Sequence, residues 1–392
     1  MAAALWVRLL AVAVAVCAPP AAAAAEAATN CRSCYTYTRF FAFGDSLTDT
    51  GNFIRYSAAP GSVARLPYGE TFFHRPTGRW SDGRLIVDFI VERLGFPYWP
   101  RYLDGKTEAD FRYGANFAVA SGTALSWQFF KEKHLNVGEI TPYSLGVQVG
   151  WLKQVLAMVA STDHARRMIM ASSLFLVGEI GGNDYIHPFF QNKTLDWVKP
   201  LVPLVINSIG SSLETLIQLG AKTLYVPGIF PLGCVPRLLF LFRGSSAGDY
   251  DGAGCLRWLN DLTVLHNDLL QAKLAELRRD HPGVAVVYAD YYGEVLDAVA
   301  SPARYGFNER TVLDACCNGG GPYNGNFTVK CSDLGAVRCT DPSRYVSWDG
   351  LHFTEAMSKI MARKMMNHLR RAQSTCPDAT TGQPLDGFDA DH

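Results

Sequence analysis

The sequence predicts a single α/β domain built on a parallel β-sheet, and three observations support this prediction. First, four short and nearly continuous apolar runs have the length of strands, at residues 39–43, 173–177, 222–226 and 284–289. Second, segments of helical length, with apolar residues three and four apart, separate the runs. Third, hydrophobic residues make up 48% of the 392 residues and charged residues only 18%, a composition that allows a large buried core.

The order of these elements indicates the kind of sheet. Apolar runs without polar alternation are typical of strands that are covered on both faces, as in parallel sheets. The predicted helices span residues 85–94, 145–159, 201–219, 256–277 and 354–371. Strand followed by helix, repeated along the chain, predicts an open sheet with helices on both faces and ligands bound beyond the carboxyl ends of the strands. No internal repeat or linker marks a second domain.

The two ends of the chain are expected to lie outside this domain. Arg8 precedes an apolar stretch that ends at Cys17, and a proline pair and a run of alanines follow, which is the order of a secretory signal peptide. We therefore expect residues 1–24 to be a signal peptide, residues 25–376 to form the domain and residues 377–392 to be a flexible polar tail. The apolar stretch is shorter than the roughly 20 residues that a membrane span needs, so we expect no span.

Charge and sequons bear on partners and compartment. The 36 Lys and Arg residues balance 36 Asp and Glu residues, so no global field attracts a nucleic acid or an anionic membrane. We expect no nucleic-acid partner, and a monomer. Asn192 and Asn326 each begin an N-glycosylation sequon, which predicts that both lie on the surface of a secretory protein.

The cysteines are expected to form disulfides. Removal of the signal peptide leaves nine of the ten: Cys31, Cys34, Cys234, Cys255, Cys316, Cys317, Cys331, Cys339 and Cys376. The first pair and the cluster at residues 316–339 also have spacings found in zinc sites, but an oxidising compartment favours disulfides. Because nine is odd, either one thiol is unpaired or the cleavage site differs.

The candidate nucleophile is Ser46. It follows the first predicted strand in Gly44-Asp45-Ser46-Leu47, at the sheet edge where α/β proteins present reactive groups. A serine hydroxyl needs a base, and the base needs an orienting group. Near the C-terminus, Asp349 and His352 stand three residues apart, a spacing that lets one turn bring the carboxylate to the imidazole. The alternatives are a helix N-cap for Asp45 or Ser46 and a structural role for His352.

Two further segments are candidates for binding a developing oxyanion. Gly181-Gly182-Asn183-Asp184 follows the second apolar run, and the side-chain amide of Asn183 can donate a hydrogen bond. Asn116-Phe117-Ala118-Val119-Ala120-Ser121-Gly122 ends in small residues whose backbone N–H groups can approach a ligand. Both segments also have an ordinary structural interpretation, as turn chemistry and as close packing.

Along the chain the four blocks follow one another at residues 44–47, 116–122, 181–184 and 349–352. In this order they resemble the plant branch of the GDSL esterase/lipase family, within the SGNH hydrolases. The resemblance covers essentially the whole mature chain and includes residues 77–84 and 319–324 as connecting segments. It implies a three-layer, flavodoxin-like sandwich with a five-stranded parallel sheet. It also implies that Ser46 is the nucleophile, that His352 is the base and that Asp349 orients the base. The backbone N–H of Ser46 and the side chain of Asn183 would be oxyanion donors.

One block departs from the family pattern. The family usually has Gly at the sixth position of the Asn-Phe-Ala block, where this chain has Ser121 followed by Gly122. The third oxyanion donor is then the N–H of one of these two residues. We expect the added side chain to crowd the site and to favour acetyl over longer acyl groups. The alternative is that the Ser121 hydroxyl turns away and bonds local backbone.

The resemblance implies a secreted carboxylic-ester hydrolase that passes an acyl group to Ser46 and then to water, with no metal and no cofactor. We expect small acyl esters, in particular O-acetyl groups on cell-wall polysaccharide such as xylan. The alternatives are an acyltransferase, a lipase or a choline-ester esterase with the same triad, and a non-catalytic wall-binding protein. The expected location is the secretory pathway, either the extracellular cell wall or the Golgi lumen. Six aromatic residues near the blocks either line a sugar-binding cleft or close the core: Tyr68, Phe73, Trp80, Trp127, Tyr185 and Trp348.

Overall fold

The computed structural model describes residues 37–372. The predicted signal peptide (1–24) and the predicted tail (377–392) lie outside these residues, as do Cys31, Cys34 and Cys376.

A five-stranded parallel sheet forms the centre of the domain, as the sequence predicts. The strands are β1 (Arg39–Phe43), β2 (Gly114–Asn116), β3 (Ser173–Val177), β4 (Thr223–Pro227) and β5 (Ala285–Ala289). Their order across the sheet is β2-β1-β3-β4-β5, and every neighbouring pair is parallel. Every residue of β3 and all but the first residue of β1 are buried, which explains why these strands have no polar alternation.

The shortest strand, β2, has no counterpart among the predicted runs. Its sequence is Gly-Ala-Asn, too short and too polar to stand out as an apolar run. It forms because its backbone pairs with β1, from Phe40 opposite Gly114 to Ala42 opposite Asn116. Gly114 has φ 105°, and a Cβ there would lie 1.9 Å from the carbonyl oxygen of Phe40, so the edge strand needs glycine at this position.

Helices connect the strands. Between β1 and β2 lie α2 (Asn52–Tyr56) and α3 (Ile86–Leu94), and between β2 and β3 lie α4 (Trp127–Glu132), α5 (Leu145–Val159) and α6 (Asp163–Ala171). Between β3 and β4 lie α7 (Gly182–Phe190), α8 (Leu195–Val198) and α9 (Val202–Gln218). The remaining helices are α10 (Pro236–Leu241), α11 (Arg257–Asp280), α12 (Tyr291–Ala300) and α13 (Glu355–Ala372).

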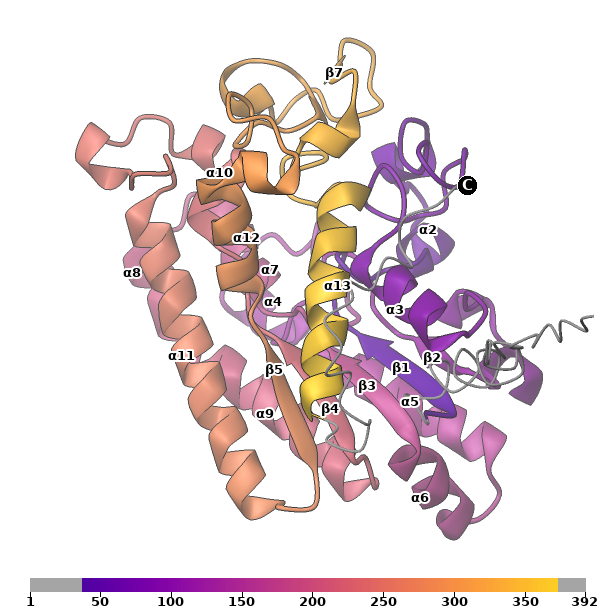
Figure 1. The fold of residues 1–392 in the computed structure, drawn as a ribbon. Helices are drawn as coiled ribbons and strands as arrows, with labels where there is room; N and C mark the ends of the chain where they lie inside the picture. Colours follow the sequence, from indigo (N-terminus) through magenta and orange to yellow (C-terminus); the bar gives the residue numbers. More distant parts are fainter. Residues whose placement is uncertain (1–36, 373–392) are drawn as a thin grey trace, which may run out of the picture. The chain divides into compact units, whose positions relative to one another are not determined.

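The helices form two layers, one on each face of the sheet (Figure 1). The chain moves one way along the sheet from β1 to β2 and the other way from β3 to β5. Because parallel crossovers are right-handed, the two directions place their helices on opposite faces. The long helices α5, α9 and α11 pack side by side in one layer, whereas α13 packs against α3 in the other. The three-layer arrangement agrees with the predicted α/β sandwich.

One segment of the described chain, Leu195–Gln218, is long and apolar enough to cross a membrane. It comprises α8, a 3-10 turn and α9, and half of its apolar window is buried inside the domain. Since α9 packs between α5 and α11, its apolar composition is accounted for by core packing.

Three disulfides join six of the predicted cysteines. Cys234 pairs with Cys255 beside the start of α11. Cys316 pairs with Cys339 and Cys317 with Cys331, which closes the segment that holds the short strands β6 (Cys317–Asn318) and β7 (Val337–Arg338). The cluster at residues 316–339 is therefore a pair of disulfides and not a zinc site. This segment lies at the carboxyl edge of the sheet, above α10 in Figure 1.

Candidate active site

Ser46 lies just beyond the carboxyl end of β1. The strand ends at Phe43, and Gly44 has φ 148°, where a Cβ would lie 3.1 Å from the carbonyl oxygen of Glu179. Gln148, a buried residue of α5, holds both polar groups of Gly44: its Oε1 accepts from the Gly44 N–H at 2.9 Å and its Nε2 donates to the Gly44 carbonyl at 2.8 Å. These contacts fix the backbone at Gly44, where the chain leaves the strand and turns towards Ser46.

Residues 45–48 form a turn and not the start of a helix. The Asp45 carbonyl accepts from the N–H groups of Thr48 at 3.1 Å and Asp49 at 2.9 Å, and its side chain accepts from the Leu47 N–H at 3.0 Å. The first helix, α2, begins later, at Asn52. The helix N-cap alternative is therefore wrong for both Asp45 and Ser46, because the Asp45 carboxylate caps a turn and not a helix. The backbone N–H of Ser46 has no acceptor among the described residues.

The structure brings Ser46, His352 and Asp349 together across 306 residues of sequence. The Ser46 Oγ lies 2.8 Å from Nε2 of His352. The other ring nitrogen, Nδ1, lies 2.8 Å and 2.7 Å from the two carboxylate oxygens of Asp349. All three residues are buried, so the hydrogen bonds are little screened by solvent. This is the geometry of a serine made nucleophilic by an oriented imidazole.

A tight turn ahead of α13 positions Asp349 and His352. Asp349 Oδ1 accepts from the N–H groups of Leu351 and His352, both at 3.0 Å, and Gly350 turns the chain with φ 93°. Burial by itself would raise the pKa of the Asp349 carboxyl. The adjacent His352, through its charge and hydrogen bonds, together with donated N–H and O–H bonds, instead holds that pKa below its ordinary value. Asp349 is thus ionised and fixed against the ring.

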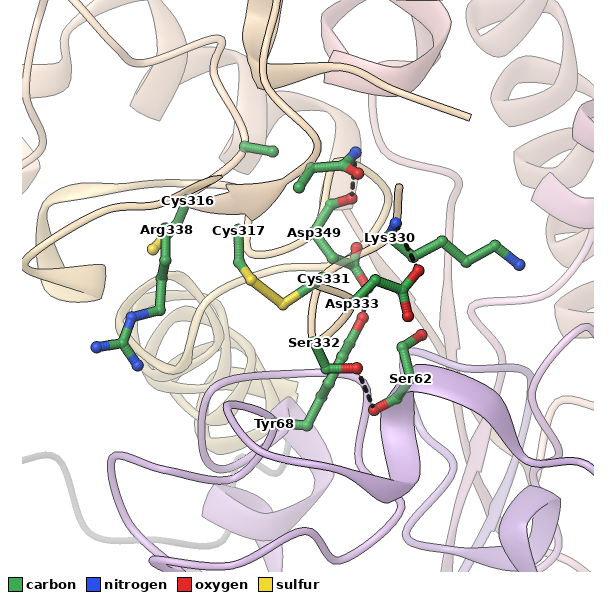
Figure 2. Close-up of a disulfide and its surroundings, with 12 residues drawn as sticks. Ser62, Tyr68, Cys316, Cys317, Lys330, Cys331, Ser332, Asp333, Arg338 and Asp349 are labelled. Atoms are coloured by element: carbon green, nitrogen blue, oxygen red, sulfur yellow. Dashed lines mark hydrogen bonds between the residues drawn. A yellow bond between two sulfur atoms is a disulfide. The ribbon is translucent and has the colours of Figure 1, made fainter. Parts of the chain in front are cut away.

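Tyr68 is a neighbour of Asp349 that the sequence analysis did not connect to it. Its buried hydroxyl donates to Asp349 Oδ2 at 2.8 Å. The ring packs edge-on against Trp80 and Trp348, in a cluster that also contains the Cys317–Cys331 disulfide. Figure 2 shows Tyr68 rising from the N-terminal segment towards Asp349, next to this disulfide. The tyrosine therefore completes the hydrogen bonding of the carboxylate.

The connecting segment at residues 77–84 packs against the turn that carries Asp349 and His352. Trp80 lies against the His352 ring, with centroids 5.0 Å apart. Arg84 pairs with Glu355, the first residue of α13, at 2.7 Å, and Asp82 Oδ1 accepts from the N–H of Glu355 at 2.8 Å. Gly83 lies so close to Glu355 that a Cβ would overlap its carboxylate. This block ties the histidine turn to the loop after β1.

The structure distinguishes the two amides of the Asn-Phe-Ala block. The Gly122 N–H donates to the Val119 carbonyl at 2.9 Å, so the turn itself uses this group. The prediction that Gly122 donates to an oxyanion is therefore not supported. The Ser121 N–H has no acceptor among residues 37–372, and Ser121 adopts φ 66° in the same pocket as Ser46. Of the two, Ser121 is the available donor.

The Ser121 hydroxyl turns away from the site. It donates to the carbonyl of Glu139, and Nε2 of His187 lies 3.0 Å from the same oxygen. Burial lowers the pKa of His187 to about 4, so its ring is neutral near pH 7. The expectation that Ser121 crowds the oxyanion site is therefore wrong, because local acceptors and donors hold the hydroxyl elsewhere.

Asn183, in the first turn of α7, also lines the pocket. Its Nδ2 donates to Asp45 Oδ2 and to the Gly122 carbonyl, both at 3.0 Å. Both amide hydrogens thus have acceptors in this structure. Asn183 can donate to an oxyanion only if one of these two hydrogen bonds is shared or exchanged. The same two bonds fix the position of its side chain beside Ser46.

Asp49 and Asn116 link the nucleophile turn to the Asn-Phe-Ala block, and the sequence analysis gave neither of them a role. The buried Asp49 carboxylate accepts from the N–H of Asn52 at 2.6 Å and of Ala120 at 2.8 Å. Asn116 Nδ2 donates to the Thr48 carbonyl at 2.6 Å. The sequence does not predict this network, because the network depends on which polar side chains are buried, and burial is not visible in the sequence.

Ser46, His352 and Asp349 line a cleft of about 590 Å³. Five aromatic residues line the same cleft: Phe53, Tyr68, Trp80, Phe190 and Phe327. Of the six aromatic residues that the sequence suggested, two, Tyr68 and Trp80, line the cleft. Tyr185 and Trp348 are fully buried core residues, Phe73 packs on Arg79, and Trp127 bonds the Val137 carbonyl.

The two sequons differ in their surroundings. Asn192 is exposed after the end of α7. Asn326 is half-buried, and its Nδ2 donates to the Gly319 carbonyl at 3.2 Å. The Asn192 side chain is therefore accessible to a glycan, whereas the Asn326 amide is partly covered and already donates to the backbone. Among residues 37–372, no group of three or more His, Cys, Asp or Glu side chains has the arrangement of a metal site.

A serine hydroxyl, an imidazole and a carboxylate in line at the carboxyl edge of a parallel sheet define an α/β protein of the serine-hydrolase class. Comparison with known proteins narrows this class. Residues 40–365 match the family described as GDSL-like Lipase/Acylhydrolase. The chain belongs to this family and is a carboxylic-ester hydrolase.

Several curated plant proteins are similar over most of their length. A GDSL esterase/lipase of Arabidopsis thaliana is 49% identical over 333 residues, which is 84% of this chain and 83% of the relative. A sinapine esterase of Brassica napus is 45% identical over 339 residues, 86% of each chain. A second Arabidopsis GDSL esterase/lipase is 45% identical over 337 residues, 85% of each.

Proposed function

We propose that this protein removes small acyl groups, in particular acetyl groups, from cell-wall polysaccharide such as xylan. The observation that carries the proposal is the Ser46 hydroxyl, 2.8 Å from His352 Nε2, in a cleft of about 590 Å³, a volume larger than an acetyl ester group alone occupies. Aromatic side chains such as Trp80 and Phe327 line the cleft together with exposed polar groups such as Glu139 and Lys330, a combination that suits stacking and hydrogen bonding to sugar rings.

In the proposed mechanism, Ser46 Oγ attacks the ester carbonyl while His352 Nε2 takes the hydroxyl proton. The developing oxyanion accepts from the free N–H groups of Ser46 and Ser121, with Asn183 beside them. His352 then returns the proton to the departing alcohol, which leaves an acyl group on Ser46. Water attacks this acyl-enzyme while His352 takes its proton, and His352 then gives that proton to Ser46 Oγ as the bond to the acyl group breaks and the acid is released. Asp349 stabilises the imidazolium that forms in each step.

The charged groups of the cleft bear on two alternatives. Arg237 and Lys330 line it together with Asp333 and Glu139, which is unlike the continuous apolar surface that a triacylglycerol requires. A choline ester carries a quaternary ammonium group, which Arg237 and Lys330 repel and Glu139 and Asp333 attract, so the charges of the cleft give no net preference for it. An acyltransferase would use the same groups with an alcohol in place of the water. The three disulfides favour a secretory, oxidising compartment, as expected for a wall-directed enzyme.

The experiment is a substrate screen with the purified secreted protein. Acetate release from acetylated xylan is measured beside hydrolysis of aryl acetates, aryl octanoates, choline esters and triacylglycerol, with Ser46→Ala as the blank. We expect acetate release from the polysaccharide and a preference for acetyl over octanoyl. Hydrolysis of long-chain esters without acetate release from xylan would overturn the proposal, and acetyl transfer to an added alcohol in preference to water would identify an acyltransferase.

A further inference from the structure

Arg237 lies beside the proposed active site and has no role in the mechanism. It is the second residue of α10, and its N–H donates to the Gly350 carbonyl at 3.0 Å. Its side-chain stem packs on the same glycine, where a Cβ would lie 3.0 Å from the arginine Cγ. Gly350 stands between Asp349 and His352, so the arginine side chain packs against the turn that carries both residues, and it lines the same cleft.

The guanidinium of Arg237 has no carboxylate partner among the described residues. Its Nε is buried without a hydrogen-bond acceptor, although the residue as a whole is half-buried. Asp349, in the adjacent turn, is already bonded by His352 and Tyr68. By contrast, Arg65, which lines the same cleft, pairs with Asp333 at 2.8 Å. A partly desolvated charge without a counterion is costly, and a ligand anion would offset that cost.

Two aromatic rings hold this guanidinium in place. Its central carbon lies 6.0 Å from the ring centroid of Phe190 and 5.6 Å from that of Phe327, and the two rings meet edge to face. In cation–π contacts of this kind, the aromatic rings stabilise the positive charge of the guanidinium but offer no hydrogen-bond acceptor to its N–H groups. The planar fork of N–H groups matches the two oxygens of a carboxylate better than any other common anion of a polysaccharide.

We propose that Arg237 binds a carboxylate of the substrate, so that the preferred ester lies on or next to a uronic acid unit of the polysaccharide. The inference rests on the proposed function for the rest of the substrate. The carboxylate would bind along the wall formed by Phe190 and Phe327, one side of the cleft above His352. Neutral acetylated chains would bind to the aromatic faces alone, with lower affinity.

The test compares two inhibitors of aryl acetate hydrolysis by the purified full chain. One is a xylo-oligosaccharide that carries a glucuronic acid branch, and the other is the same molecule after its carboxylate has been reduced to an alcohol. A hydrogen-bonded ion pair predicts a roughly 10-fold lower inhibition constant for the acidic molecule. Arg237→Gln is expected to reduce this ratio to about 2 or less, and Arg237→Lys, which keeps the charge without the fork, to leave an intermediate ratio.

The control is Arg243→Gln. Arg243 is an exposed arginine just after α10 that packs on Phe240 and does not line the cleft. It is expected to keep both the basal activity and the wild-type ratio. Equal inhibition by the two oligosaccharides, or an unchanged ratio in a folded Arg237→Gln, would overturn the proposal. Acetate release from acetylated xylan is measured separately. Its absence, with an Arg237-dependent ratio retained, rejects the polysaccharide esterase and keeps the carboxylate site.

Discussion

A chain of hydrogen bonds connects Ser46, His352 and Asp349, and each residue has one role in it. The serine presents its oxygen to the cleft, the histidine joins it at 2.8 Å, and the aspartate fixes the ring through both carboxylate oxygens. Tyr68 extends this chain of hydrogen bonds by one further bond. Substitutions at these residues should therefore change the rate of reaction more than the binding of substrate.

Ser46→Ala removes the attacking atom and leaves the rest of the pocket in place. We expect ester turnover to fall by about 10⁴- to 10⁶-fold, the scale of a lost triad nucleophile. The measurement is kcat for an aryl acetate with purified protein. Ser212→Ala, which removes a buried serine hydroxyl in α9 away from the cleft, is the matched control. More than a tenth of wild-type activity in Ser46→Ala would show that another group is the nucleophile.

Tyr68→Phe removes one hydrogen bond from the Asp349 carboxylate and keeps the aromatic ring. We expect kcat to fall about 10-fold with little change in KM, because a bond to a charged group is worth roughly 1.5–3 kcal/mol and the hydroxyl acts on the carboxylate. Tyr225→Phe is the control, since that buried hydroxyl bonds the Met365 carbonyl and does not line the cleft. An unchanged kcat would mean that the other donors suffice to hold Asp349.

At the scale of elements, the site depends on loops that follow parallel strands and meet at one edge of the sheet. The loop after β1 supplies Ser46, the loop after β2 supplies Ser121, and the loop after β3 leads to Asn183. The edge strand β2 therefore has a functional consequence, because its pairing with β1 sets where the Ser121 loop begins. Four of the five strands are visible as apolar runs in the sequence, and β2 is not.

Gly114→Ala tests the importance of this edge strand. The added Cβ would lie 1.9 Å from the Phe40 carbonyl oxygen, and alanine disfavours φ 105°, so the β1–β2 pairing must shift. We expect a loss of about 1–3 kcal/mol in the free energy of unfolding, measured by urea denaturation, together with reduced activity. Gly146→Ala in α5, with no atom within 4 Å of the new Cβ, should be neutral or stabilising. Equal effects of the two substitutions would contradict the argument.

At the scale of the whole molecule, buried carboxyl groups make stability depend on pH. Burial raises the pKa of Asp184 to about 7, and burial likewise raises the pKa of Asp49 and of Asp82 to about 6. The folded state therefore holds these protons up to a higher pH than the unfolded chain, in which Asp titrates near 3.9. The stability that they contribute is complete below about pH 4 and is lost as pH rises to about 7. Asp349 has a lowered pKa and the opposite dependence, at low pH only. The buried His187 and His266, whose pKa values burial lowers to about 4 and about 3, also oppose the raised carboxyl groups, because the unfolded chain protonates them below about pH 6.5.

Burial also raises the pKa of Asp45 to about 7 and raises the pKa of Glu179 well above its ordinary value. Between pH 5 and pH 8 the five raised carboxyl groups outweigh the two buried histidines, so we expect the midpoint of thermal unfolding to be higher at pH 5 than at pH 8. Each group contributes about 1.4 kcal/mol per unit of pKa difference. Asp82→Asn retains an oxygen to accept the Glu355 N–H and removes the titration. This variant should show a shallower decline between pH 4 and pH 6 than the wild-type protein. A midpoint that rises from pH 5 to pH 8 would contradict the assignment of these buried groups.

The sequence by itself determined the α/β class, four of the five strands, the long helices and the order of the chemistry-bearing blocks. These features depend on local composition and on residues a few positions apart, which a sequence displays directly. The candidates Ser46, Asn183, Asp349 and His352 also follow from short motifs, and the structure places all four at one cleft.

The tertiary structure decided which groups are free and which are occupied. It engages the Gly122 N–H in a turn, leaves the Ser121 N–H without an acceptor and turns the Ser121 hydroxyl towards Glu139. It also brings Tyr68 to Asp349 over 281 residues of chain, and leaves Arg237 in the cleft without a counterion. The Tyr68–Asp349 bond joins segments far apart in the sequence, and the surroundings of Arg237 likewise come from distant segments. Local patterns carry no information on such pairings, because the partner is set by how the layers pack.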